Sequence, residues 1–167
     1  MTNSDVATTR IEARRTMPVP PSTVFEIICD PDGHVQIDAS GMLMAAEGER
    51  VRGVGDSFLV HMDREALGDM PLGEYEVRPE IVGYAEDRYL EWKINSVLDP
   101  PFGHTYGFMI EPDPGDAQRC VVTAFCDWSN MHEAYVGKVT MPIVPQASLR
   151  ATLGILDRVA RRRQAER

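Results

Sequence analysis

The stretch that decides the fold closes the chain: Gln146–Arg163, QASLRATLGILDRVARRR. Leu149, Leu153, Leu156 and Val159 recur at the spacing of one helical face, which predicts a single long amphipathic helix. A helix that follows so many strand patterns has one place to bury its apolar stripe, the concave face of the sheet. A curved sheet that grips a helix also encloses space that the helix alone does not fill.

The segments before this helix alternate apolar and polar residues, which is typical of strands with one buried face. The clearest alternation is Glu74–Ile81, where Pro79 favours an edge position or a bulge because proline has no backbone N–H to donate. The fold class is therefore α+β, with an antiparallel sheet of six or seven strands. We expect strands over Thr8–Met17, Met42–Ala46, Ser57–Asp63, Glu74–Ile81, Tyr89–Ser96, Phe102–Ile110 and Gln118–Trp128.

Two short helices are expected after the first strand. Pro20 or Pro21 pre-sets a first helical turn, with Ser22 and Thr23 as nearby capping hydroxyls. The sequence DPDG at 30–33 ends that helix, and a second short helix or turn covers His34–Asp38.

The length of 167 residues suits one domain. We expect residues 1–7 to be disordered, residues 8–163 to form the single domain and residues 164–167 to fray. The segment 129–145 is irregular and apolar, and we expect it to line the mouth of a cavity. No internal repeat and no linker interrupts the domain.

Charge and cysteine usage exclude several classes of function. The formal net charge of -9 disfavours nucleic acid and anionic membranes as partners. No apolar run is long enough to span a bilayer, and residues 1–6 lack the pattern of a signal peptide. Cys29, Cys120 and Cys126 are an odd number without CxxC spacing, so we expect reduced thiols in a cytoplasmic protein and no zinc site.

Arginines crowd the end of the chain, at Arg158, Arg161, Arg162, Arg163 and Arg167. We interpret them first as a solvated helix end whose cations complement the helix dipole. A docking site for an acidic partner is the alternative.

The order of strand, two short helices, several antiparallel strands and a long final helix resembles the helix-grip fold of the START-like, Bet v 1-like superfamily. The stretches that carry the likeness are MPVPPSTVFE at 17–26, DP at 30–31 through H34 to IDASG at 37–41, YLEW at 89–92, VVT at 121–123 and DWS at 127–129. They look most like bacterial members of polyketide cyclase/dehydratase type. The resemblance covers nearly the whole chain and implies an internal apolar cavity, but it names no substrate.

Four polar residues are candidates for catalysis at such a cavity. His34 and Asp38 are four apart, so in a helix they share a face and a His–Asp pair could exchange protons with a carbonyl ligand. Their alternative role is to cap or close a loop. His104 and Tyr106 share the aromatic face of one strand and could orient an apolar guest, whereas the alternative for His104 is a core histidine bonded to a backbone carbonyl.

The leading hypothesis is a binding protein for a small hydrophobic molecule such as a lipid, polyketide or aromatic metabolite. An enzyme of cyclase or dehydratase type that uses His104, Tyr106 or His34 is the second, and a protein-interaction module is the third; a homodimer is compatible with all three. We expect no cofactor and no metal, since no recognised metal, phosphate or nucleophile motif is present. The expected ligand-binding residues are Phe25, Phe58, Val60, Tyr75, Val77, Trp92, Ile94, Phe108, Val122, Trp128, Leu149 and Leu153.

Overall fold

A seven-stranded antiparallel sheet in the order β1-β7-β6-β5-β4-β3-β2 forms one layer of the fold. The computed structural model describes residues 8–95 and 98–167. Residues 1–7 and Ser96, expected to be a disordered tail and the end of a strand, lie outside the described residues. The strands are β1 Arg10–Met17, β2 Leu43–Glu47, β3 Leu59–Asp63, β4 Glu74–Ala85, β5 Tyr89–Asn95, β6 Thr105–Asp113 and β7 Asp116–Asp127.

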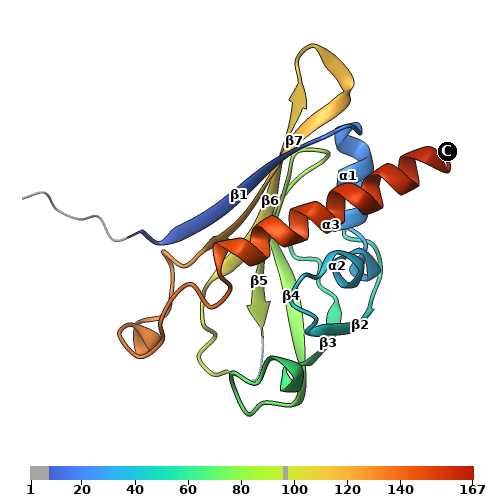
Figure 1. Cartoon of the computed structure of the whole chain (residues 1–167). Helices are drawn as coiled ribbons and strands as arrows, with labels where there is room; N and C mark the ends of the chain where they lie inside the picture. Colours follow the sequence, from blue (N-terminus) through green and yellow to red (C-terminus); the bar gives the residue numbers. More distant parts are fainter. Residues whose placement is uncertain (1–7, 96–97) are drawn as a thin grey trace, which may run out of the picture.

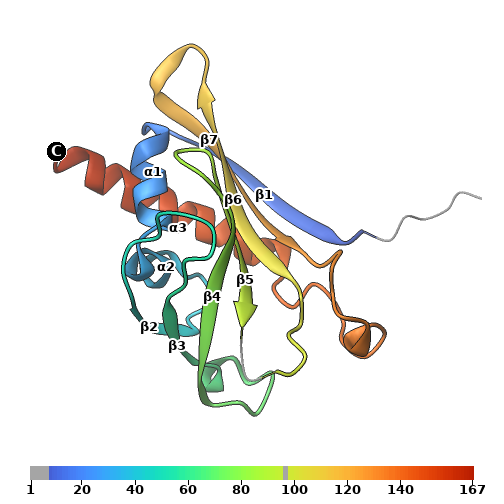
Figure 2. The ribbon, with the colours of Figure 1, turned by 180° about the vertical axis from the view of Figure 1, so that it is seen from behind.

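The long helix α3, Gln146–Ala165, crosses one face of this sheet (Figures 1 and 2). Its buried residues Leu149, Leu153 and Leu156 are those of the expected stripe, and Ala160 continues the stripe where Val159 is only half-buried. The α+β helix-grip architecture predicted from the sequence is therefore confirmed. The helix runs to Ala165, two residues beyond the expected end.

The part of α3 from Leu153 onward closes a solid core together with α1, Pro21–Ile28. Phe25, Val122, Leu153 and Leu156 are at most 1% exposed in this core. Polar contacts fix the same end, because Thr23 donates a hydrogen bond to Gln164 at 2.8 Å and Arg167 pairs with Glu26. Arg163 also lies 3.8 Å from Asp30. Part of the C-terminal arginine cluster is thus paired within the chain.

The second short helix, α2, Pro31–Ile37, packs directly against α1. A Cβ added to Gly33 would lie 1.8 Å from the carbonyl oxygen of Ile27, so only glycine permits this approach. The approach places the next residue, His34, against the end of α1. Asp30 begins α2 as its N-cap, accepting a hydrogen bond from the backbone N–H of Asp32 at 3.1 Å.

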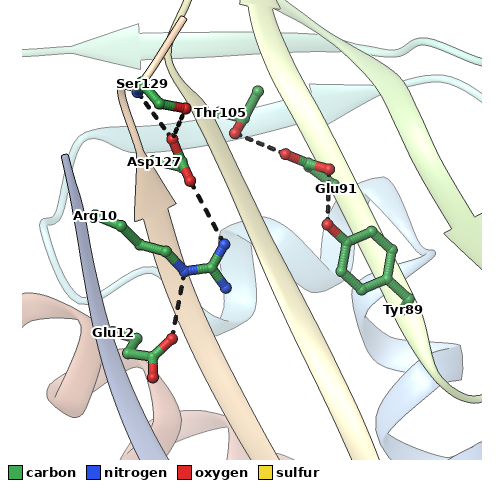
Figure 3. Close-up of polar contacts among 7 residues, drawn as sticks. All are labelled: Arg10, Glu12, Tyr89, Glu91, Thr105, Asp127 and Ser129. Atoms are coloured by element: carbon green, nitrogen blue, oxygen red, sulfur yellow. Dashed lines mark hydrogen bonds and ion pairs between the residues drawn. The ribbon is translucent and has the colours of Figure 1, made fainter.

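The outer face of the sheet carries a polar network in place of a second layer (Figure 3). Arg10 of β1 pairs with Glu12 and, at 3.6 Å, with Asp127 of β7. Glu91 of β5 accepts hydrogen bonds from Tyr89 at 2.7 Å and Thr105 at 2.8 Å. Residues on this face alternate with the core residues of the same strands, so charged and hydroxyl groups meet water here while their neighbours face α3.

Two local expectations are wrong. Ser22 and Thr23 do not cap α1, whose first residue follows Pro20 without a side-chain cap, because the Thr23 hydroxyl turns to Gln164. Pro79 lies in the interior strand β4, and the bulge is two residues later, between Ile81 and Gly83. Pro79 stands opposite Phe58, beyond the last regular β3–β4 pair of Val60 with Val77, so its missing N–H interrupts no regular ladder.

Candidate functional site

A cavity of about 990 Å³ lies between the sheet, α2 and the N-terminal half of α3. Loop residues 64–73, 98–104 and 131–144 complete its wall. Met70, Leu72 and Leu98 line it and are 41%, 46% and 44% exposed, so the cavity opens to solvent at these loops. The space beside α3 is therefore divided into a solid end at α1 and a hollow end at the loops.

Most of the apolar residues expected at the site do line the cavity. They are Val60, Tyr75, Val77, Trp92, Ile94, Phe108 and Leu149. Phe25, Phe58, Val122 and Leu153 do not, because they are packed in the solid core. Trp128 is half-buried and also lies off the cavity, where its backbone N–H donates to the carbonyl oxygen of Thr9. The irregular segment supplies Tyr135, Val139 and Ile143, as expected.

His104 and Tyr106 line the cavity with ring centroids 5.3 Å apart, but only Tyr106 belongs to β6, which begins at Thr105 and not at Phe102 as expected. His104 is 8% exposed, and burial lowers its pKa to about 4, so the imidazole is neutral at pH 7. Its Nδ1 is the one buried side-chain nitrogen or oxygen among the described residues that has no hydrogen-bond partner. Burial, and then the Cys126 thiol nearby, raise the pKa of Tyr106, which keeps its phenol protonated.

Close packing between residues 100–103 and residues 130–135 holds His104 in place. Gly103 has a φ of +89°, and a Cβ there would lie 2.5 Å from the carbonyl oxygen of Asn130. The backbone N–H of His132 donates to the carbonyl oxygen of Phe102 at 2.9 Å, and the Tyr135 hydroxyl donates to that of Pro100 at 2.6 Å. The Phe102 ring stacks on Tyr135 and meets His104 edge-on. Only glycine at position 103 leaves room for the backbone at Asn130 to pack this closely.

His34 and Asp38 both line the cavity, but each bonds to other groups. The Nε2–H of His34 donates to the carbonyl oxygen of Ile28 at 2.7 Å, and its ring lies 5.0 Å from Phe58 and 4.9 Å from Trp92. Burial lowers the pKa of His34 to about 4. The Asp38 carboxylate accepts hydrogen bonds from the Ser40 backbone and hydroxyl and from the Leu43 backbone. These partners match the structural alternative for each residue.

The sequence pattern missed a buried cation in the cavity wall. Arg64 is 8% exposed and binds Asp69 through two hydrogen bonds of 2.8 and 2.7 Å. This pairing raises the pKa of Arg64 and lowers that of Asp69. Both residues belong to the loop between β3 and β4, where no periodicity marks a buried position. The one indication in the sequence that this loop packs over an apolar cavity is its content of apolar residues, namely Leu67, Met70 and Leu72.

No group of His, Cys, Asp and Glu within 8–95 and 98–167 is arranged to hold a metal ion. The three cysteines are free and buried, and burial raises the pKa of Cys29 to about 12 and those of Cys120 and Cys126 to about 11. Such thiols stay protonated and unreactive near neutral pH. Within the part of the chain that the structure covers, no helix has the length and apolarity needed to cross a membrane.

No family model and no curated protein matches this chain in sequence. Solved structures match it over nearly its whole length. A protein of Mycobacterium smegmatis is 13% identical with a TM-score of 0.62, covering 98% of this chain and 96% of that one. Norcoclaurine synthase of Thalictrum flavum, as a point mutant with a transition-state analogue, is 13% identical with a TM-score of 0.61, covering 93% and 95%.

An AHSA1-like protein of Aeromonas hydrophila is 14% identical with a TM-score of 0.59, covering 93% of this chain and 94% of that one. At such identities the likeness concerns the fold alone. It agrees with the helix-grip fold that the START-like, Bet v 1-like resemblance implied.

Proposed function

We propose that this protein binds a small apolar molecule in the cavity beneath the N-terminal half of α3. The observation that carries the proposal is the cavity itself, about 990 Å³ in volume and lined mostly by aliphatic and aromatic side chains. Ligand sites typically occupy about 300–1,000 Å³ and combine an apolar wall with a few polar groups. Lipids, polyketides and aromatic metabolites are the ligand classes of suitable size and polarity.

The cavity supports binding more than the two alternatives. A protein-interaction module would be favoured by a solid core, whereas this one is hollow at one end. Norcoclaurine synthase was solved with a transition-state analogue, so the same fold is compatible with catalysis in that protein. In this chain, however, the pKa values of about 4 for His34 and His104 make both imidazoles weak bases at neutral pH.

The three free, buried cysteines support a reducing compartment. We therefore place this binding activity in the cytoplasm, as part of the same proposal.

Titration with N-phenyl-1-naphthylamine, an uncharged apolar fluorophore, tests the proposed function. Wild-type protein should bind it saturably with an increase and a blue shift of fluorescence. Thr152→Trp places an indole into the cavity from α3 and should weaken binding at least tenfold, roughly 1.4 kcal/mol or more. Ala151→Trp is the matched control, because residue 151 is the exposed neighbour on the same helix.

The control variant should keep the wild-type dissociation constant within about twofold. Absence of saturable binding by the wild type, or equal affinities for Thr152→Trp and Ala151→Trp, would refute a guest in this cavity. Thermal unfolding of both variants checks that they are folded. Native mass spectrometry of the purified protein would identify any guest retained from the cell.

A further inference from the structure

We infer that the guest carries one carboxylate on its apolar body and places this group against the guanidinium of Arg64. The inference rests on the proposed function and specifies the chemical class of its ligand, an amphipathic acid such as a fatty acid or an aromatic carboxylic acid. A cavity with an apolar wall alone would favour neutral molecules of the same size, because a carboxylate loses its hydration on entry.

Arg64 is a buried cation in the wall of the cavity. Its side chain is 9% exposed, and it lines the cavity together with its partner Asp69. Two phenols of the same wall interact with it. Tyr75 adds to the effect of Asp69 in raising the pKa of Arg64, and the charge of Arg64 opposes the rise that burial causes in the pKa of Tyr106. A guanidinium and two hydroxyl groups therefore gather in one part of a mostly apolar wall.

Asp69 occupies only one side of the guanidinium. Its two carboxylate oxygens accept hydrogen bonds from Nε of Arg64 at 2.8 Å and from Nη2 at 2.7 Å. Arginine has five N–H donors, so this pairing leaves both N–H groups of Nη1 and one of Nη2. Among the described residues Nη1 makes no hydrogen bond, and unlike Nδ1 of His104 it is not sealed from solvent. The end of the guanidinium can therefore bind a second carboxylate through two parallel hydrogen bonds.

The charges around the cavity leave Arg64 available to an anion. The side chain of Asp69 is 45% exposed, so water screens its negative charge far more than the positive charge of the buried Arg64. The carboxylate of Asp38 is already held by hydrogen bonds from Ser40 and Leu43. Among the described residues that line the cavity, Arg64 is the one with a full positive charge at neutral pH. Asp69 is accordingly a positioning residue that orients the guanidinium toward the guest.

Two naphthalenes of nearly equal size and shape test the inference: 2-naphthoate, which is an anion, and 2-naphthamide, which is neutral. Competition against N-phenyl-1-naphthylamine gives their affinities for the wild type, for Arg64→Met and for Arg64→Gln. The wild type should bind 2-naphthoate roughly tenfold more tightly than 2-naphthamide, because charge-assisted hydrogen bonds outweigh the lost hydration. Both variants should lose at least about tenfold in affinity for 2-naphthoate and keep that for 2-naphthamide within about threefold.

Arg78→Met is the matched control, because it removes the same charge from an exposed position of β4. Residue 78 lies between Val77 and Pro79, which both line the cavity, so its side chain is on the outer face of the sheet. This variant should keep the wild-type preference for 2-naphthoate. Thermal unfolding shows which of the three variants are folded, and the two substitutions at Arg64 give two independent chances of a folded protein.

The outcomes separate the inference from the proposed function. A wild type that binds 2-naphthamide as tightly as 2-naphthoate would overturn the inference. A preference for 2-naphthoate that survives in a folded Arg64 variant, or that Arg78→Met also abolishes, would do the same. If the fluorophore binds but 2-naphthoate does not displace it, the inference alone fails. If the fluorophore does not bind the wild type, the proposed function itself fails.

Discussion

His34 shows how one buried residue joins the fold to the cavity. It follows Gly33, the glycine that lets α2 approach α1, and it donates a hydrogen bond to the last residue of α1. Its ring packs between Phe58 of the core and Trp92 of the cavity wall. Because a charged imidazole would lose its hydration there, the folded protein keeps His34 neutral well below the ordinary pKa of histidine.

This burial makes stability depend on pH. The pKa of His34 is about 4 in the folded protein and 6.5 in an unfolded chain, so between these values only the unfolded chain binds the proton. The free energy of unfolding therefore falls as the pH drops from 6.5 toward 4. His34 alone should account for a loss of about 2 kcal/mol between pH 7 and pH 5.

Urea unfolding of the wild type and of His34→Gln at the two pH values measures this loss. The variant should be less stable at pH 7, since glutamine cannot reproduce the packing, but it should lose about 2 kcal/mol less on acidification. His104 remains in both proteins and contributes equally to each. An equal loss in the two proteins would show that His34 does not titrate in this window.

At the scale of elements, α3 is held at its middle by a buried carboxylate. Asp157 is 4% exposed and binds Arg15 of β1 at 2.8 Å, on the core face of the sheet. It also accepts a hydrogen bond from Arg161, one turn along the helix, at 3.1 Å. The first contact joins helix to sheet, whereas the second stays within the helix.

Asp157→Asn should destabilise the protein by about 1–3 kcal/mol, because the amide weakens a charge-assisted contact in a buried site. Arg161→Gln, which removes only the exposed contact within the helix, should cost about 0.5 kcal/mol or less. Chemical denaturation of both variants provides the comparison. An equal loss of unfolding free energy in the two variants would mean that the contact between Asp157 and Arg15 stabilises the protein no more than the contact within the helix.

Strands with a regular alternation were predictable from the sequence. Phe58, Val60 and Met62 of the β3 region, and Leu90, Trp92 and Ile94 of β5, face the core side as expected. Their period of two depends only on which face is buried, a local property of the chain. The cap of α1 was not predictable, since the Thr23 hydroxyl is claimed by Gln164, 141 residues away.

The candidate site was predicted less completely than the fold. Alternation identified the cavity face of β4, β5 and β6, but it could not distinguish the hollow end of that face from the solid end. Phe25 of α1, Val122 of β7 and Leu153 of α3 pack in the core away from the cavity for a similar reason, because periodicity shows that a residue faces inward but not whether the space beside it is filled. Arg64 was missed because its burial depends on a loop closing around Asp69, which leaves no periodic trace in the sequence.

Across the whole molecule, the solid and hollow ends should differ in local stability. The mouth segments 64–73, 98–104 and 131–144 lie outside the strands and the α-helices, so their backbone hydrogen bonds are mostly those of turns and short 3-10 helices, and several of their apolar side chains are exposed. In hydrogen exchange, their amides should exchange faster than those of α1 and of residues 153–163 in α3. Saturating N-phenyl-1-naphthylamine should slow exchange in the mouth segments and leave the solid end nearly unchanged.

Mass spectrometry of peptide fragments resolves these segments. Uniform exchange along the chain would contradict a division of the molecule into two ends. Protection by the fluorophore that is confined to α1 or to the outer face of the sheet would place its binding site elsewhere.

The separation of the two ends bears on how this protein could diversify. Met70, Leu72 and Leu98 meet the opening of the cavity, while the core residues that stabilise the fold lie around α1 and the far half of α3. Substitutions at the three mouth positions should therefore change the free energy of unfolding of the domain only slightly. A combinatorial library at these positions would sample new ligand preferences on an intact scaffold. Gly103 is the position that such a library must leave unchanged.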